Sequence, residues 1–512
     1  MKYFLFLLFL ISQVSIGQIT DAKLNADVHK KKLGIANYGI VGEDDEYFYS
    51  LTNQSKKDSK REYQINQYNK KTLATAYSGS VTAALSNQKG ILFHSIKTIA
   101  GQSYFFQVKQ EKDGSAVVFS QKFDKQCKLS DEVVYLDTIP NLEDAANPYS
   151  YATDKISILV SEDQSKFAIK KNNYFDEGSQ TIAYKVFNKD QNAIGTSTAK
   201  VPNHRKNFIE LACVFQNNGD LVLLGMHHNG RDTGVFTSNP MVELYVLDLK
   251  KGAVKTTRIK SKRGKVMSAS LCVDSKRNLV IISGVTAKSW ERYNSAFTVH
   301  YDLSTNALKP INEKALTEAV FPAVQKYKRV SPINEYHVQK VLLKSNGESV
   351  MMLEKQHIIK SHEMGSQIIY TSHYARDIYV INSTSVGKIT WMSLIPKNSM
   401  PDYPNTLRAQ FMVTVKKNKT YLVFSDIKEN SKSMTKFVIK PAIFKLSDCV
   451  SVMVTIDARG KMKKSVLFKG KQSKVVVQPM QSVYGAKSDQ FLLFGCNGLM
   501  GRKYQYGRVN IK

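Results

Sequence analysis

The sequence lacks any apolar run long enough to span a membrane as a helix. Such a span takes about 20 residues, whereas the N-terminal run Tyr3–Ile11 has nine. This run follows a lysine and precedes the small residues Ser15 and Gly17, an order typical of a cleavable secretory leader. We therefore expect residues 1–17 to be a signal peptide and residues 18–512 to be exported to the periplasm.

Cysteine is scarce, and its spacing excludes the common zinc and redox motifs. The five cysteines are scattered without a C-x-x-C pair, and several lie within or beside apolar segments. An odd number leaves at least one thiol outside any disulfide. We expect small buried side chains, with one disulfide as the alternative because exported proteins form such bonds. The five are Cys127, Cys213, Cys272, Cys449 and Cys496.

Recognisable catalytic motifs are also missing. The sequence contains no H-E-x-x-H, G-x-S-x-G, P-loop or G-x-G-x-x-G pattern and no EF-hand loop. Tryptophan is limited to Trp290 and Trp391, which we interpret as packing residues near strand ends. The sequence therefore predicts no catalytic residue, no cofactor and no metal ion, and it favours a non-enzymatic protein.

Acidic residues are few relative to basic ones. The 73 lysines and arginines outnumber 43 aspartates and glutamates, which gives a net charge of +30. Such a field attracts an acidic protein surface, an acidic glycan or an anionic membrane surface. Nucleic acid is disfavoured because the leader directs the chain out of the cytoplasm and the basic residues are not interleaved with stacking aromatics. We interpret the basic clusters at 56–61, 260–265 and 461–474 as solvated turns between strands.

A short phrase recurs eight times along the rest of the chain. Each copy is a polar turn followed by a compact apolar strand, and the strands begin roughly 45 to 75 residues apart. A period in this range, with several strands per unit, is typical of a propeller. The copies begin at Asp44, Asn87, Asp163, Asn217, Asp274, Ser345, Lys417 and Lys487, and their strands begin at Tyr47, Ile91, Phe167, Leu221, Leu279, Val350, Tyr421 and Phe491.

A second strand with alternating polarity follows most copies, as in Glu243–Asp248 and Asp377–Ile381. A turn rich in Asn, Asp, Lys and Gly comes next, and then a short outer strand, so that each unit holds four antiparallel strands. We therefore predict an all-β fold in one domain, residues 18–512. Its architecture is a single β-propeller of seven or eight four-stranded blades.

Two segments have special roles in this prediction. The last unit ends one strand short, and the segment near Gly34–Val41 is expected to supply the missing strand and close the ring. The segment 312–320 is rich in helix formers and Pro322 follows it, so we predict a short helical insertion there.

The candidate binding residues are polar side chains in expected loops. Adjacent histidines followed by an acid offer transition-metal ligands, but neighbouring strand residues point to opposite faces. We interpret this first group, around an Asn-Gly step, as a solvated contact loop: His227, His228, Arg231 and Asp232. The second pair, His357 and His362, is assigned to the long hairpin of the sixth repeat. The expected contact loops are Arg231–Pro240, Lys288–Asn294 and Gln356–Ser366.

The C-terminal third carries five distinctive strand phrases: Asp377–Ile381, Gly387–Trp391, Ile395–Lys397, Phe491–Gly495 and Arg502–Arg508. Through them, roughly residues 335 to 512 resemble uncharacterised exported proteins of Gram-negative bacteria that use the type 9 secretion system. The chain is also similar to the periplasmic plug subunit that closes the idle outer-membrane translocon of that system. The resemblance implies export and a repeated β fold, and it carries no catalytic residues.

Export, basic charge and missing catalytic motifs together predict a non-enzymatic periplasmic binding or scaffold protein. We expect it to dock onto an outer-membrane or other envelope protein complex, as a plug or accessory subunit of a secretion translocon. The alternative is a periplasmic hydrolase or lyase acting on an acidic glycan, which requires paired carboxylates about 5 to 10 Å apart. Clustered carboxylates or a metal in the central funnel favour the enzyme, whereas an apolar or basic loop face favours docking.

Overall fold

The computed structural model describes most of the chain between residues 22 and 511. The expected signal peptide lies outside the described residues, as do several loops. The described residues are 22–25, 29–30, 35–55, 61–81, 91–111, 113–140, 156–176, 179–200, 208–229, 239–289, 292–316, 336–362, 369–399, 410–432, 448–473, 475–485, 488–497 and 503–511.

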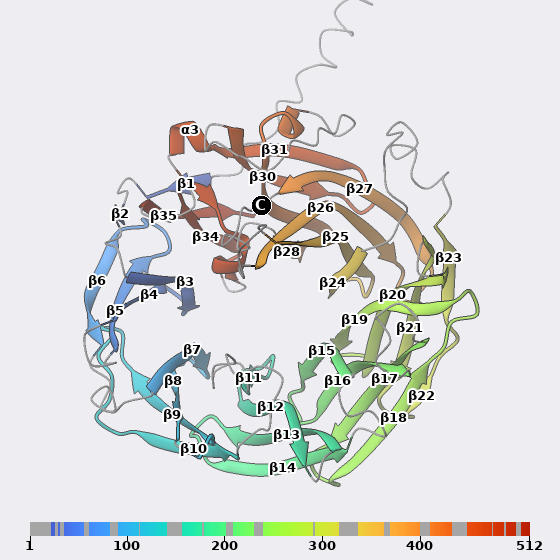
Figure 1. The fold of residues 1–512 in the computed structure, drawn as a ribbon, viewed down its shortest axis with the longest axis horizontal. Coiled ribbons are helices and arrows are strands. Elements are labelled where there is room, and N and C mark those ends of the chain that lie inside the picture. Colours follow the sequence, from blue (N-terminus) through green and yellow to red (C-terminus); the bar gives the residue numbers. More distant parts are fainter. Residues whose placement is uncertain are drawn as a thin grey trace, which may run out of the picture.

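Eight antiparallel sheets surround a central axis, and each forms one blade of a propeller (Figure 1). The first strand of a blade lies near the axis and the last strand lies at the rim. The all-β propeller prediction is confirmed, and the number of blades is eight.

Blades 1 to 4 each consist of four consecutive strands. Blade 1 contains β3 (Ile35–Glu43), β4 (Tyr47–Ser55), β5 (Arg61–Asn69) and β6 (Thr75–Val81). Blade 2 contains β7 (Ile91–Ile99), β8 (Gln102–Gln110), β9 (Ala116–Phe123) and β10 (Val134–Ile139). Blade 3 contains β11 (Ile156–Val160), β12 (Lys166–Asp176), β13 (Ser179–Asn188) and β14 (Ala193–Lys200). Blade 4 contains β15 (Phe208–Phe215), β16 (Leu221–Asn229), β17 (Asn239–Asp248) and β18 (Ala253–Ile259).

Blades 5 to 8 are more varied. Blade 5 contains β19 (Lys265–Asp274), β20 (Leu279–Ser289), β21 (Arg292–Asp302), β22 (Ala307–Leu308) and β23 (Asn312–Ala315). Blade 6 contains β24 (Tyr336–Leu343), β25 (Ser349–His362), β26 (Ile369–Ser383) and β27 (Ile389–Ser399). Blade 7 contains β28 (Phe411–Lys416), β29 (Lys419–Ile427), β30 (Cys449–Ile456) and β31 (Met462–Lys469). Blade 8 contains β32 (Val476–Val477), β33 (Val483–Gly485), β34 (Gln490–Cys496), β35 (Lys503–Asn510), β1 (Ala22–Leu24) and β2 (His29–Lys30).

Helical structure is minor in the part of the chain that the structure describes. It is confined to short turns: η4 (Asn430–Lys432), α3 (Gly470–Ser473) and η6 (Pro479–Gln481). No helix of the described residues is long and apolar enough to cross a membrane.

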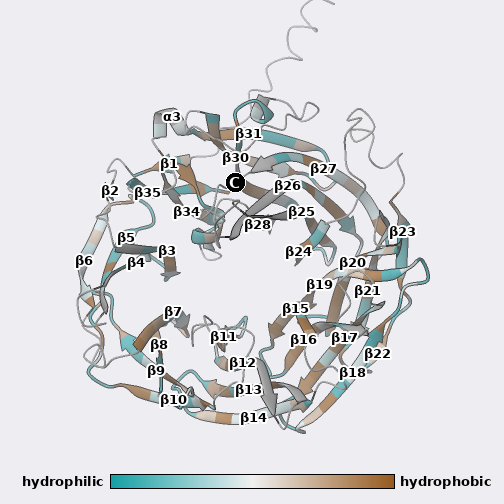
Figure 2. Cartoon of the chain, viewed as in Figure 1, coloured by the Kyte–Doolittle hydropathy of each residue, from teal (hydrophilic) through white to brown (hydrophobic). Residues whose placement is uncertain are grey.

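The hydrophobic core lies between neighbouring blades. The second strand of a blade is buried on both faces, which is why it appears in the sequence as a continuous apolar run. In β16, for example, the four residues Leu221–Leu224 are all fully buried. Val222 and Leu224 pack against Val280 and Ile282 of blade 5. Figure 2 shows hydrophobic residues concentrated in the strands within the blades.

The recurring phrase marks the second strand of a blade in seven of its eight copies. The exception is the copy that begins at Asn87. Its strand starts at Ile91 and is β7, the first strand of blade 2. The equivalent turn of that blade is Ala100–Gly101, where both residues have positive φ and β8 follows directly. This turn lacks the polar Asp, Asn and Lys residues of the phrase, so the sequence pattern pointed to the wrong strand.

The ring is closed by strands from both ends of the described chain, as predicted, but the predicted segment was wrong. Residues 35–43 form β3 and belong to blade 1. The closing strands are β1 and β2, which lie upstream and pair with β35, so that Ala22 faces Val509 and His29 faces Tyr504. Figure 1 shows β1 beside β35. This pairing covers the outer edge of β35.

The predicted helical insertion is also wrong over its first four residues. Asn312–Ala315 form strand β23, which pairs with β21 and places Glu313 opposite Phe297. Pro310 has no N–H to give to the ladder, so it interrupts the outer strand of blade 5, which resumes as β23. Residues 317–320 lie outside the described residues.

Candidate functional site

One pocket lies where the turns between first and second strands of four blades converge. These turns come from blades 3, 4, 5 and 6, and they enclose a volume of about 620 Å³. The turns are the polar parts of the recurring phrase, so the sequence repeat builds this pocket. The lining residues are Glu162, Asp163, Asn217, Val273, Asp274, Ser275, Lys276, Arg277, Leu343, Lys344, Ser345, Asn346 and Gly347.

Short-range hydrogen bonds shape these turns. Asp163 Oδ1 accepts the N–H of Ser165 at 3.0 Å, and Asn346 Oδ1 accepts the N–H of Glu348 at 3.2 Å. Gly347 has a φ of +82°, which glycine adopts without steric strain. The Asp, Asn and Gly residues of the phrase therefore specify tight turns at this face.

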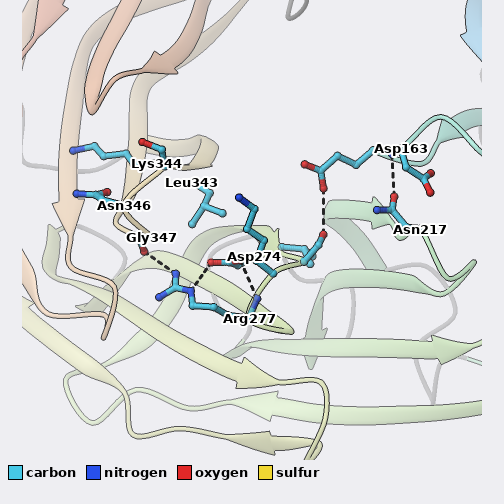
Figure 3. Close-up of a pocket in the computed structure, with 13 residues that line it drawn as sticks. Asp163, Asn217, Asp274, Arg277, Leu343, Lys344, Asn346 and Gly347 are labelled. Atoms are coloured by element: carbon cyan, nitrogen blue, oxygen red, sulfur yellow. Dashed lines mark hydrogen bonds and ion pairs between the residues drawn. The ribbon is translucent and has the colours of Figure 1, made fainter. Parts of the chain in front are cut away.

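Hydrogen bonds between blades connect the turns on one side of the pocket. The N–H of Asp163 in blade 3 donates to Asn217 Oδ1 in blade 4 at 3.1 Å, and Lys166 Nζ donates to the Asn217 carbonyl at 2.7 Å. Ser275 Oγ of blade 5 donates to Glu162 Oε2 of blade 3 at 3.2 Å. Figure 3 shows the bond between Asp163 and Asn217. These contacts fix three neighbouring turns relative to one another.

Arg277 links blades 5 and 6 on the other side of the pocket (Figure 3). Its Nε donates to Asp274 Oδ2 at 2.5 Å, and its Nη2 donates to the Gly347 carbonyl at 2.9 Å. A Cβ atom at Gly347 would lie 2.7 Å from Arg277 Nη2. The glycine therefore provides both the turn conformation and the space for the guanidinium group.

The two lysines that line the pocket differ in environment. Lys344 is fully buried, and its Nζ donates to Asn382 Oδ1 at 2.5 Å and to Glu348 Oε2 at 3.2 Å. The Lys344 Nζ also lies 5.5 Å from the ring centre of Trp391. Lys276 is exposed and forms no ion pair with a described carboxylate. Lys276 is therefore the pocket cation most available to a ligand.

The pocket is lined by side chains of both charge signs, and hydrogen bonds between the turns hold several of them in place. Partial burial acts to raise the pKa of Asp163, but hydrogen bonds from the Ser165 N–H and the Ser161 hydroxyl outweigh it and lower the pKa below its ordinary value. Asp163 is therefore ionised at neutral pH. Among the described residues, no three His, Cys, Asp or Glu side chains are grouped so as to hold a metal ion.

His227 lies elsewhere, and its predicted position in a solvated loop is wrong. It belongs to β16, opposite Met241 of β17, and its side chain is 1% exposed. The His227 Nε2 lies 2.7 Å from Tyr245 Oη and 3.0 Å from Glu243 Oε2. The Asn-Gly step did not end the strand because β16 stays paired with β17 as far as Asn229.

The other predicted site residues are not brought to the pocket. His228 lies next in β16, opposite Pro240, while Arg231 and Asp232 lie outside the described residues. His357 and His362 lie in the long β25–β26 hairpin, opposite Tyr374 and Ile369. His228, His357 and His362 lie toward the ends of β16 and β25 that are remote from the turns lining the pocket. Of the expected contact loops, residues 231–238, 290–291 and 363–366 lie outside the described residues. The remaining residues belong to strands: 239–240 to β17, 288–289 to β20, 292–294 to β21 and 356–362 to β25.

A buried group of charged side chains between blades 6 and 7 was missed by the sequence analysis. Lys397 forms an ion pair with Glu354, and neither side chain is exposed. Lys464 of blade 7 forms an ion pair with Asp426 at 2.8 Å and also donates to the Pro396 carbonyl of blade 6 at 3.2 Å. The only hint in the sequence is a charged pair, Glu354 and Lys355, directly after the apolar run of β25.

Burial perturbs the carboxyl groups of this charged group. Asp377 lies beside this group, and its Oδ1 accepts the Lys397 N–H at 3.4 Å. Burial raises the pKa of Asp377 to about 7, although this N–H and nearby cations oppose the shift. Burial also raises the pKa of Glu354, against the effect of Lys397. Raised pKa values can mark a catalytic acid, but Glu354 is fully enclosed and neither residue lines the pocket.

All five cysteines lie within the described residues, and no disulfide joins them. Three are buried and two are partly buried, as expected for small apolar side chains. Trp391 also has the predicted packing role. Its indole Nε1 donates to the Ala458 carbonyl at 2.9 Å, and Gly460 lies against the ring.

No protein-family model matches the chain, and no curated protein matches it. Among solved structures, the Dos1 propeller has 8% sequence identity and a TM-score of 0.45, with 96% of each chain covered. The β-propeller domain of the Trilobed protease from Pyrococcus furiosus has 12% identity and a TM-score of 0.32, with 77% of this chain and 100% of that chain covered. A mutant of the Synechocystis apocarotenoid oxygenase has 10% identity and a TM-score of 0.31, with 68% and 72% covered. These similarities concern the fold alone.

Proposed function

We propose that the protein is a non-enzymatic binding subunit of the bacterial envelope that docks onto a partner protein through the face containing the pocket. The observation that carries this proposal is the network of hydrogen bonds between blades at the turns. It holds charged and polar groups from four blades in fixed positions before any partner arrives. A surface arranged in advance loses less conformational entropy on binding.

The charge of the chain supports an acidic partner. The net charge of +30 favours approach of an acidic surface. At the pocket itself, Lys276 is exposed and forms no ion pair with a described carboxylate, so it is available to a partner carboxylate. The leader-like N-terminus and the resemblance to exported proteins support a periplasmic location and a partner in the outer membrane, as a plug or accessory subunit of a secretion translocon.

The pKa pattern favours binding over glycan hydrolysis. A glycosidase needs one carboxyl group with a raised pKa as the general acid beside the bond to be cleaved. In the pocket the pKa of Asp163 is lowered. The carboxyl groups with raised pKa, Glu354 and Asp377, are in the interface between blades 6 and 7.

Site-specific photocrosslinking in the native envelope tests the proposal. A photoreactive amino acid at Lys276 is expected to capture one outer-membrane protein in stoichiometric amount. The same group at Asp113, in the turn between the second and third strands of blade 2, is the control because those turns lie on the opposite face of a propeller blade. Capture from Asp113 alone, or from neither position, contradicts docking through this face.

A second measurement separates docking from catalysis. With the captured protein purified, Lys276→Glu is expected to weaken binding by about tenfold, the effect of losing roughly 1.4 kcal/mol. Incubation of the wild-type protein with an acidic polysaccharide such as polygalacturonate is expected to release no reducing ends above a blank. Sustained release of reducing ends supports the hydrolase instead.

A further inference from the structure

The outer strand of blade 4, β18, is an unusually regular edge. It pairs with β17 on one side over seven consecutive residues, from Ala253 opposite Asp248 to Ile259 opposite Val242, without a register shift. It is the last strand of its sheet and lies at the rim of the ring (Figure 1). The backbone N–H and C=O groups on its other side therefore face outward along about 20 Å.

The other long outer strands that the structure describes in blades 1 to 7 are irregular. Pairing of β6, β10, β14, β27 and β31 with the preceding strand is interrupted in each case by a register shift. Such irregularities twist an edge and protect it from pairing with another chain. In blade 5 the outer strand is divided into β22 and β23. Blade 4 lacks this protection along β18.

Basic side chains are dense on β18 and in the segments directly before and after it, and we call this group the rim stripe. No acidic residue occurs between Leu249 and Val273. Every member of the rim stripe is exposed. The members are Lys250, Lys251, Lys255, Arg258, Lys260, Lys262, Arg263 and Lys265.

Most of these cations have no acidic partner among the described residues. Lys251 lies 3.7 Å from Asp248 and Arg263 lies 4.0 Å from Glu313, but the other six form no ion pair with a described carboxylate. Two independent features thus coincide at this edge: a regular row of outward backbone groups and a field of one sign.

We propose that β18 is a second docking site, at which an extended acidic segment of a partner polypeptide adds to blade 4 as a fifth strand. The backbone ladder supplies affinity in this mode of recognition, and the rim stripe selects carboxylate side chains. A second copy of this chain is disfavoured because two rim stripes would repel each other. The regular backbone edge favours a polypeptide over a glycan or lipid surface, which has no strand to add.

The test uses a fluorescent peptide of about eight residues with alternating Glu and Val, added to the full chain. Anisotropy at about 50 mM salt is expected to show saturable binding. A second peptide of the same sequence carries N-methyl groups on alternate residues, so it keeps the charges but loses the N–H groups on one side. It is expected to bind about tenfold more weakly or worse. Equal binding of the two peptides, or no binding of the first, overturns strand addition.

Charge reversal provides the matched protein variants. Lys255→Glu with Arg258→Glu is expected to weaken the first peptide by about tenfold or more. The control reverses two exposed lysines on the irregular outer strand β31, Lys463→Glu with Lys469→Glu, and so changes net charge equally. Equal weakening by both pairs means that only net charge matters, which overturns the site. Thermal unfolding confirms that each variant is folded, and the N-methylated peptide tests the wild type in any case.

Other polyanions are separate outcomes of the same experiment. If dextran sulfate or phosphatidylglycerol vesicles bind through Lys255 and Arg258 while the peptide does not, the rim stripe is a glycan or lipid surface and the proposal is wrong. We expect the β18 site to be independent of the pocket face. Lys276→Glu should therefore leave peptide binding at β18 unchanged.

Discussion

Gly347 illustrates how a single residue holds two blades together. Its positive φ allows the turn, and its missing side chain leaves room for Arg277, which donates to its carbonyl. A glycine in such a phrase is easily attributed to the turn alone. The space requirement is visible only when the guanidinium group of the next blade is in place.

Gly347→Ala is predicted to destabilise the protein by more than the backbone strain alone. Alanine at a positive φ costs about 1 kcal/mol, and the clash with Arg277 adds to that cost. Gly252→Ala is the control, since Gly252 has a φ of +59° and no atom outside the glycine and its two chain neighbours lies within 4 Å of the position that a Cβ would take there. Urea unfolding measures both variants. Equal destabilisation of the two would show that Arg277 moves aside without loss.

Asp377 is predicted to make the protein less stable as the pH rises. Its pKa is raised to about 7 in the folded state, whereas an unfolded Asp has a value of about 3.9. The stabilising effect of its proton is therefore complete below about pH 4 and is lost as the pH rises through about 7. Asp377→Asn should remove this loss and stabilise the protein at about pH 8 by on the order of 2 kcal/mol relative to wild type.

Urea unfolding between about pH 5 and pH 8 measures this effect. Asp163→Asn is the control, because the pKa of Asp163 is lowered and the group stays ionised across that range. The change in the free energy of unfolding caused by Asp163→Asn should therefore be the same at every pH in that range. A difference between wild type and Asp377→Asn that is constant with pH would contradict the prediction.

The cysteine thiols are predicted to be unreactive in the folded protein. Burial raises the pKa of Cys127 and of Cys272 to about 12, so little thiolate forms near pH 8. A thiol reagent such as Ellman's reagent should react slowly with the native protein and rapidly with all five cysteines in guanidinium without reductant. Recovery of only three thiols from the denatured protein would reveal a disulfide.

At the scale of residues, the sequence predicted whether a side chain is buried better than it predicted which other side chains it contacts. The low exposure of the cysteines was expected because several of them lie within or beside apolar segments, and the packing role of Trp391 was expected from its position near a strand end. The loop position of His227 was wrong, because strand pairing with β17 carried β16 past the expected end. The ion pair of Glu354 with Lys397 joins residues 43 positions apart, and no local pattern reports such a pairing.

At the scale of elements, ring closure depends on two short strands. β1 and β2 together contribute five residues that pair with β35. Without them the outer side of β35 is an open edge next to the aromatic cluster of Phe48, Tyr68 and Tyr506. His29 stacks on Tyr504 and extends this cluster.

Deletion of residues 18–30 is predicted to lower the unfolding temperature by roughly 5 °C or more, because blade 8 loses its outer strand. Deletion of residues 18–21, which leaves both closing strands in place, is the control. Differential scanning calorimetry measures both. Equal unfolding temperatures for the two deletions would show that the ring does not depend on this pairing.

The recurring phrase predicted strand identity because it joins two physical requirements. A strand buried on both faces must be apolar throughout, and the preceding turn must expose polar residues with positive φ. The phrase failed in blade 2, where Ala100 and Gly101 form the turn without polar side chains. It also gave no information on the regularity of β18, because register is set by pairing between strands.

At the scale of the whole molecule, the sequence predicted a propeller with four-stranded blades, but it did not decide whether the number of blades is seven or eight. The number is set by the angle between neighbouring blades, and that angle follows from how the apolar clusters between them fill space. The pocket could not be assembled from the sequence either. Glu162 and Ser275 belong to blades 3 and 5, and only the curvature of the ring brings them within hydrogen-bonding distance.

The closing pair β1 and β35 also determines how the ring responds to mechanical force. Ala22 lies opposite Val509, and the two strands are antiparallel, so the chain enters and leaves this ladder at the same end. A pull on the two ends of the chain therefore opens the ladder one bond at a time instead of shearing all its bonds together. Under tension, blade 8 should peel away first, while the seven blades whose strands are consecutive in the chain bear no load.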